Sequence, residues 1–193
     1  MIQLVHTLCN RWLLLFFFLP LVGCATQLKK NEPVGLDETV FVIGIKPAEF
    51  NPILFPGYIR DGKFHLYTTR NGYGNNPEEG YMITKVKPGD LLGITKVLIK
   101  RGSFGPTFKM CGNKKTLVFK VPKGKVVYIS DIRYEEHKGY ITFEYADKFN
   151  EAKEYIDREY PALRNRMEKW EYELLPITAS CTETIHVTVP RYN

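Results

Sequence analysis

Residues 116–126 read TLVFKVPKGKV, and this stretch decides the fold class. Leu117, Phe119 and Val121 recur at every second position, which places their side chains on one face of an extended strand. The next three residues supply a proline, which fixes φ, and a glycine, which adopts positive φ readily. An apolar stretch then resumes at Val126. The pattern therefore predicts two strands joined by a sharp turn.

The same features recur along the chain. Residues 85–91 (KVKPGDL) repeat the Lys-Val, proline and glycine of the first turn, and we interpret this as convergent turn chemistry. Residues 39–45 (TVFVIGI) form a nearly continuous apolar run, as in a strand that is buried on both faces. Alternating strands are also expected at 63–69, 140–145 and 184–189. This recurrence indicates an antiparallel sheet with one solvated face.

One helix is expected late in the chain. Within residues 147–160, apolar side chains recur at spacings of three and four, which predicts an amphipathic helix over about 149–159. Asp147 or Asn150 can cap its start, and Pro161 either ends it or begins a second short helix. The segment 163–174 fits helical and strand spacing equally. The expected fold is a mainly β, antiparallel β-sandwich with one inserted helix, and the alternative is an α+β arrangement.

The start of the chain has the features of an export signal. Residues 12–22 (WLLLFFFLPLV) are apolar and follow Arg11, with no acid before them. This run is shorter than the ~20 residues that a spanning helix needs. It fits the apolar region of a secretory signal peptide. An ordinary signal peptide or an uncleaved anchor is the alternative to the more specific interpretation that follows.

Leu21, Val22, Gly23 and Cys24 match the lipobox of bacterial lipoproteins. The resemblance implies cleavage before Cys24, lipid attachment at its thiol and acylation of the new amino terminus. It divides the chain into a signal peptide (1–23), a lipidated tether (24–36) and one β-rich globular domain (37–193). Because Ala25 and not aspartate follows the cysteine, the resemblance favours the outer membrane, with the domain facing the periplasm.

Composition limits the classes of partner. Removal of residues 1–23 leaves 26 Lys and Arg against 21 Asp and Glu, a small surplus that is spread along the chain. No basic run is interleaved with aromatic residues, so no nucleic-acid partner is expected. The predicted partners are the membrane, through the lipid, and an envelope protein.

Two cysteines remain in the expected mature chain. Cys111 and Cys181 form an even pair in an oxidising compartment, which predicts one disulfide, and two separate buried thiols are the alternative. Neither cysteine has a Cys or His partner at the spacing of a zinc site, so no metal or other cofactor is expected.

Two longer stretches resemble a pattern in uncharacterised bacterial lipoproteins. They are GYMITKVKPGDLLGI (80–94) and LVFKVPKGKVVYISDI (117–132). Those domains resemble transthyretin-like or immunoglobulin-like sandwiches, so the resemblance implies that fold and names no activity. Ser130 departs from the pattern, because many of the similar proteins carry glycine there.

No motif of nucleophilic, metal-dependent or phosphate-binding catalysis is present, so the chain is not expected to be an enzyme. His65 and His186 lie on polar faces of expected strands, and His137 lies in a turn, all three as solvated residues.

The loop 70–81 (RNGYGNNPEEGY) is the most unusual segment. Tyr73 and Tyr81 could stack on sugar rings while Asn75 and Asn76 bond hydroxyls, or the segment is simply a long turn. The expected function is therefore a non-enzymatic protein-interaction or assembly module of the cell envelope. The alternative is a lipoprotein that binds cell-wall glycan.

Overall fold

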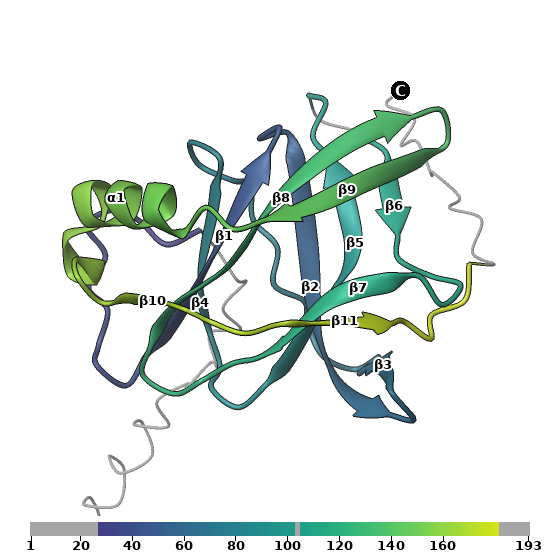
Figure 1. Ribbon diagram of the computed structural model, residues 1–193, viewed down its shortest axis with the longest axis horizontal. Coiled ribbons are helices and arrows are strands. Elements are labelled where there is room, and N and C mark those ends of the chain that lie inside the picture. Colours follow the sequence, from purple (N-terminus) through teal and green to yellow (C-terminus); the bar gives the residue numbers. More distant parts are fainter. Residues whose placement is uncertain (1–26, 103–104, 182–193) are drawn as a thin grey trace, which may run out of the picture.

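The computed structural model describes residues 27–102 and 105–181 (Figure 1). The lipobox with Cys24, the expected strand 184–189 and His186 lie outside these residues. The strands are β1 (Thr39–Lys46), β2 (Phe50–Arg60), β3 (Lys63–Leu66), β4 (Tyr81–Val86), β5 (Leu91–Ile99), β6 (Thr107–Lys109), β7 (Lys115–Lys120), β8 (Val126–His137), β9 (Tyr140–Ala146), β10 (Met167–Lys169) and β11 (Glu173–Pro176). Helix α1 (Phe149–Glu159) and the 3-10 turn η1 (Pro161–Leu163) lie between β9 and β10.

The strands form two sheets, which confirms the mainly β fold with one late helix. The first sheet has the order β10-β8-β1-β4, and β9 also pairs with β8. The second has the order β11-β7-β5-β2-β3, and β6 also pairs with β5. The second sheet curls into a half-barrel, because Ile177, just after β11, bridges to Phe64 of β3.

The expected antiparallel pairing holds for the second sheet but not throughout the first. Strand β8 runs parallel to both β1 and β10. Alternation of apolar residues fixes which face of a strand is buried, but it does not fix the direction of the neighbouring strand. The two parallel pairs therefore could not be predicted from the spacing.

The main core lies between the two sheets. Leu117, Phe119 and Val121 are buried there, as their spacing predicts. Strand β1 is buried on both faces, because alternate residues face the main core and a second cluster under α1. Val40 and Val42 of β1 meet Ile156 of the helix in that second cluster.

Helix α1 has the predicted bounds, but neither Asp147 nor Asn150 is its N-cap residue. Lys148 is its N-cap residue and supplies no side-chain bond, while the Asp147 carboxylate accepts a bond of 3.2 Å from the Phe149 N–H. Pro161 begins the short helix η1, which is one of the two outcomes predicted for this proline. The segment that fitted both spacings leaves η1 through a turn at residues 164–166, and from Met167 it is extended and forms β10 and the start of β11.

Candidate functional site

The structure separates the residues of the predicted recognition loop. Tyr73 forms a two-bond backbone bridge to Leu54 of β2, with N···O distances of 2.7 and 2.8 Å, and its half-buried ring packs against the main core. Asn75 is buried, and its Nδ2 donates to Thr84 Oγ1 at 2.8 Å. Asn76 is exposed.

Tyr81 begins β4 and packs against the helix. Its ring stacks on Tyr155 of α1, with centroids 4.6 Å apart, in the second cluster. Removal from water raises the pKa of Tyr81 to about 12, so the phenol is neutral at physiological pH. The two tyrosines thus pack against different clusters, and a joint role for them in sugar binding stays a prediction.

The segment expected to be a tether is docked on the edge of β4 from Gln27 onward. Leu28 donates its N–H to Ile83 O at 2.9 Å, and its side chain is buried among Ile83, Tyr155 and their neighbours. The Gln27 side chain accepts a bond from the Ile83 N–H at 3.0 Å and donates to Tyr81 O at 3.2 Å. The segment therefore continues the first sheet and does not act as a spacer over these residues.

Ion pairs fix the same segment at two further points. Lys30 Nζ lies 2.8 Å from Glu159 Oε2 and 3.0 Å from Glu79 Oε1. Hydrogen bonds to these two carboxylates raise the pKa of Lys30, and the bond to Glu159 has the larger effect. Lys85 Nζ lies 3.1 Å from both Glu32 Oε1 and Glu38 Oε1. The chain from Gln27 to Glu38 is thus bound to β4 and to the helix.

The predicted disulfide is confirmed. Cys111 and Cys181 are bonded, with Cα atoms 5.2 Å apart and a sequence separation of 70. The bond extends a ladder in which Gly112 and Asn113 donate to Ala179 O and Ile177 O. In the chain-entropy model, closing a loop of this length contributes about 4 kcal/mol. The bond thus ties the segment after β11 to the chain before β7.

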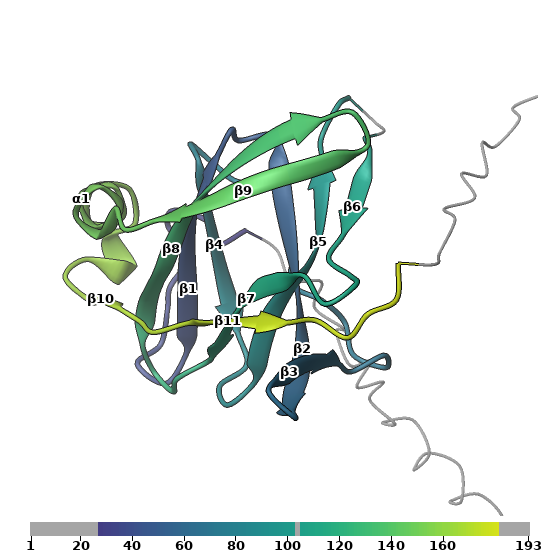
Figure 2. The same ribbon diagram turned by 45° about the vertical axis from the view of Figure 1, so that its right-hand side comes forward.

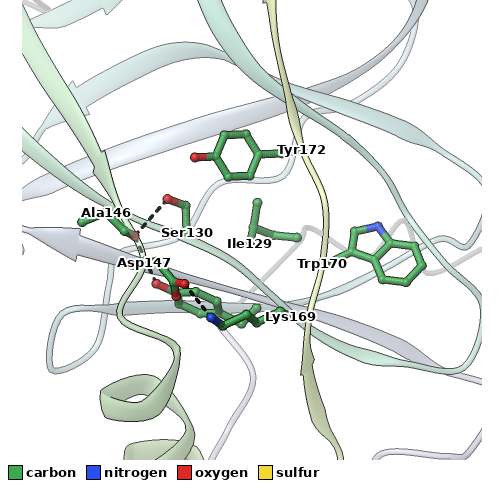
Figure 3. Close-up of a pocket in the computed structure, with 8 residues that line it drawn as sticks. Ile129, Ser130, Ala146, Asp147, Lys169, Trp170 and Tyr172 are labelled. Carbon is green, nitrogen blue, oxygen red and sulfur yellow. Dashed lines mark hydrogen bonds and ion pairs between the residues drawn. The ribbon is translucent and has the colours of Figure 1, made fainter.

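A cavity of about 160 Å³ opens at the outer edge of β8 (Figure 3). Strand β10 pairs with residues 126–128 of β8 and β9 pairs with residues 131–137, so neither pairs with Ile129 and Ser130. The cavity lies at this interruption. Its lining is Tyr128, Ile129, Ser130, Ala146, Asp147, Lys169, Trp170 and Tyr172.

The cavity combines aromatic walls with one ion pair. Lys169 Nζ lies 2.5 Å from Asp147 Oδ2, and this contact is the main cause that holds the pKa of Asp147 below its usual range. Figure 3 shows Tyr172 projecting toward Ser130, Trp170 projecting to the other side of the same chain segment, and the ion pair below them. Trp170 is fixed by an Nε1 bond of 2.8 Å to Lys120 O. Sequence analysis missed this site, because the spacing of residues 163–174 did not distinguish a helix from a strand.

A buried polar network adjoins the cavity. Tyr128 donates its hydroxyl to Asp131 Oδ2 at 2.6 Å and accepts a bond from the Lys148 N–H at 2.8 Å. Asp131 is 5 % exposed, and burial raises the pKa of its carboxyl group. The network links β8 to the start of α1, so it positions one wall of the cavity.

The two described histidines lie apart from this cavity. His65 stacks on Tyr58, with centroids 5.1 Å apart, and His137 stacks on Tyr140 at 4.7 Å. Within residues 27–102 and 105–181, no group of three or more His, Cys, Asp or Glu side chains could hold a metal ion. Across the same residues, no helix is long and apolar enough to cross a bilayer.

A comparison with known protein families, curated proteins and solved structures finds no match to this chain.

Proposed function

We propose that this chain is a lipid-anchored protein of the bacterial cell envelope, and that its sandwich is a non-enzymatic protein-interaction or assembly module. The lipobox residues Leu21 to Cys24 support the anchor. The proposed location is the outer membrane, with the sandwich facing the periplasm, and Ala25 after the cysteine supports it.

One structural observation carries the proposal: Gln27, three residues after Cys24, is already paired with Thr84 of β4. Three residues span at most about 11 Å when fully extended. A lipid on Cys24 would therefore hold the sandwich beside the bilayer surface. This arrangement suits a protein that meets a partner in or on the same membrane.

The cavity at the edge of β8 is the surface best suited to a protein partner. Tryptophan and tyrosine dominate the energetics of protein interfaces, because they bury large areas at a small cost in side-chain entropy. Trp170 and Tyr172 are half-buried beside the exposed Lys169. The cavity volume of about 160 Å³ is suited to a single side chain of a partner rather than to a larger ligand.

Replacement of Cys24 tests the anchor. In cells grown with labelled palmitate, the wild-type protein should carry the label and fractionate with the membrane. Cys24→Ser should lose the label, while Cys111→Ser, which removes a different thiol, should keep it. A labelled Cys24→Ser protein would contradict the proposal.

Site-specific photocrosslinking tests the partner surface. A photoreactive amino acid at Lys169, in intact cells, should capture one envelope protein in a product of defined mass. The same amino acid at Glu154, which is exposed on α1, is the matched control and should not capture it. Trp170→Ala should abolish the product at position 169. Equal capture at both positions, or no product at either, would refute this surface.

A further inference from the structure

One end of the sandwich, here called the basal end, is made of the turns 87–90 and 121–125, the β2–β3 hairpin 57–67 and residues 36–38. Figure 2 shows the hairpin and the turns after β4 and β7 together at the lower end of the molecule. Hydrogen bonds and strand pairing join them. The Gly89 N–H donates to Val121 O at 2.9 Å, Gly57 lies opposite Leu91, and the Gly124 N–H donates to Thr39 Oγ1 at 3.0 Å.

The basal end exposes apolar and aromatic side chains. Leu36 is 84 % exposed, and Tyr58, Ile59 and Tyr67 are 39–44 % exposed. These are four of the six large hydrophobic residues that are exposed among the described residues. The rings of Tyr58 and Tyr67 lie 5.4 Å apart, so the hairpin presents a continuous aromatic surface to solvent.

The unpaired charge of the basal end is mainly positive. Lys63, Lys87 and Lys123 are exposed, and within the described part of the chain none of them lies within ion-pair distance of an acid. The nearby acids are largely engaged. Asp90 binds Arg70 at 2.8 Å, Glu38 binds Lys85, and Asp61 lies 3.6 Å from Arg60. Among the described residues of the basal end, only Asp37 has an exposed carboxylate that makes no ion pair.

At Gln27 and Leu28 the described chain runs away from this end. Gln27 bridges Thr84 in an antiparallel manner, and Leu28 bonds the preceding residue of β4, Ile83. The direction of the chain at Gln27 is therefore away from the Val86 end of β4, where the turn 87–90 begins. A lipid attached upstream of Gln27 would lie on the basal side of the domain.

We infer that the basal end is a second membrane contact, which binds the anionic phospholipid headgroups of the leaflet that holds the anchor. Tyrosine is favoured at the membrane interface because its ring is apolar and its hydroxyl is polar. Lysines near an anionic surface add attraction that acts within about 10 Å. The inference rests on the proposed function for the anchor, and it fixes which face of the sandwich the membrane covers.

The test uses the mature chain from residue 24, carrying Cys24→Ser so that no lipid contributes. Cosedimentation is measured with vesicles of 70 % phosphatidylcholine and 30 % phosphatidylglycerol, and with pure phosphatidylcholine. The protein should bind the anionic vesicles alone. The combined change Lys63→Glu, Lys87→Glu and Lys123→Glu should weaken binding on the order of 100-fold, from about fivefold per lysine.

The matched control has the same change of charge at the opposite end of the sheets. Lys46→Glu, Lys100→Glu and Lys138→Glu, combined, should keep binding within about threefold of the unchanged protein, since only local cations act at this range. A third variant, Tyr58→Ser with Tyr67→Ser, should also weaken binding. Circular dichroism of each variant separates lost binding from lost folding.

Two results would overturn the inference. One is a failure of the unchanged protein to bind anionic vesicles, including the case in which it is retained on peptidoglycan instead. The other is an equal loss in the control variant. Neither result bears on acylation of Cys24, which palmitate labelling reports separately.

Discussion

At the scale of single residues, Asp131 is a buried acid that contacts both β1 and Tyr128. Its carboxylate lies against Gly44, where an added Cβ would come within 2.3 Å of it, so only glycine fits at that point of β1. The carboxylate depends on Tyr128 for a hydrogen bond. Burial and the neighbouring acid, in that order, raise the pKa of Tyr128, so its hydroxyl stays protonated and able to donate.

The pKa of Asp131 leads to a pH-dependent prediction. Because burial raises this pKa, the folded protein binds the proton more tightly than the unfolded chain does. The stabilisation from this group is complete below the unfolded pKa and is lost as the pH rises through the folded pKa. Asp131→Asn cannot ionise but keeps an oxygen that accepts from Tyr128.

The free energy of unfolding of Asp131→Asn, relative to the wild type, should therefore increase as the pH rises above about 4. Urea unfolding between pH 4 and pH 8 measures this difference. Lys46, Lys148 and Glu151 also act on the carboxyl group and are unchanged in the variant. A difference that is constant or falls with pH would contradict the assignment.

Tyr128→Phe, which removes the donor, should lower the free energy of unfolding by about 1–3 kcal/mol.

At the scale of elements, the segment 27–38 works as an additional edge element of the first sheet. A sheet edge presents unpaired backbone groups that attract other strands. Gln27 and Leu28 cover part of the outer edge of β4. The segment thus protects this edge and also places the expected anchor close to the fold.

Two leucines in this segment give a matched test of docking. Leu28 is 2 % exposed and Leu36 is 84 % exposed. Leu28→Ala should lower the free energy of unfolding by about 2–5 kcal/mol, because it leaves a cavity in the second cluster. Leu36→Ala should change it by less than about 0.5 kcal/mol. Urea unfolding of both variants decides the matter, and equal effects would show that the segment is not docked.

The sequence predicted which face of a strand is buried, and where the chain turns, better than it predicted which strands pair. Phe119 and Ile141 are buried as their spacing indicates, and Gly89 and Gly124 both adopt positive φ in the two similar turns. Helix α1 matches its predicted range because the spacing of apolar residues at every third or fourth position depends only on the local sequence. Parallel pairing of β8 depends on strands that are distant in sequence, which no local pattern encodes.

The docked segment and the cavity were missed for the same physical reason. Leu28 is one apolar residue in a polar stretch, so it has no periodicity to reveal its burial. Trp170 and Tyr172 line one cavity with Ser130 only because β9 and β10 share one edge of β8. Asn75 was a residue of the possible ligand loop, with a plain turn as the alternative, and the structure buries it against Thr84.

At the scale of the whole molecule, the two sheets, the helix and the disulfide form one body that begins close to the predicted anchor. In the proposed arrangement, a lipid at Cys24 would turn the basal end, with its lysines and tyrosines, toward the bilayer and leave the cavity at the edge of β8 open to a partner. The account as a whole depends on a lipid at Cys24.

The mass of the N-terminal tryptic peptide of the membrane-extracted protein tests that claim most directly. Processing before Cys24 and tryptic cleavage after Lys29 yield the peptide CATQLK. The account predicts this peptide with its mass increased by a diacylglycerol group on the thiol and an acyl chain on the amino terminus. Recovery of the same peptide unmodified, or of a peptide that continues upstream of Cys24, would contradict it.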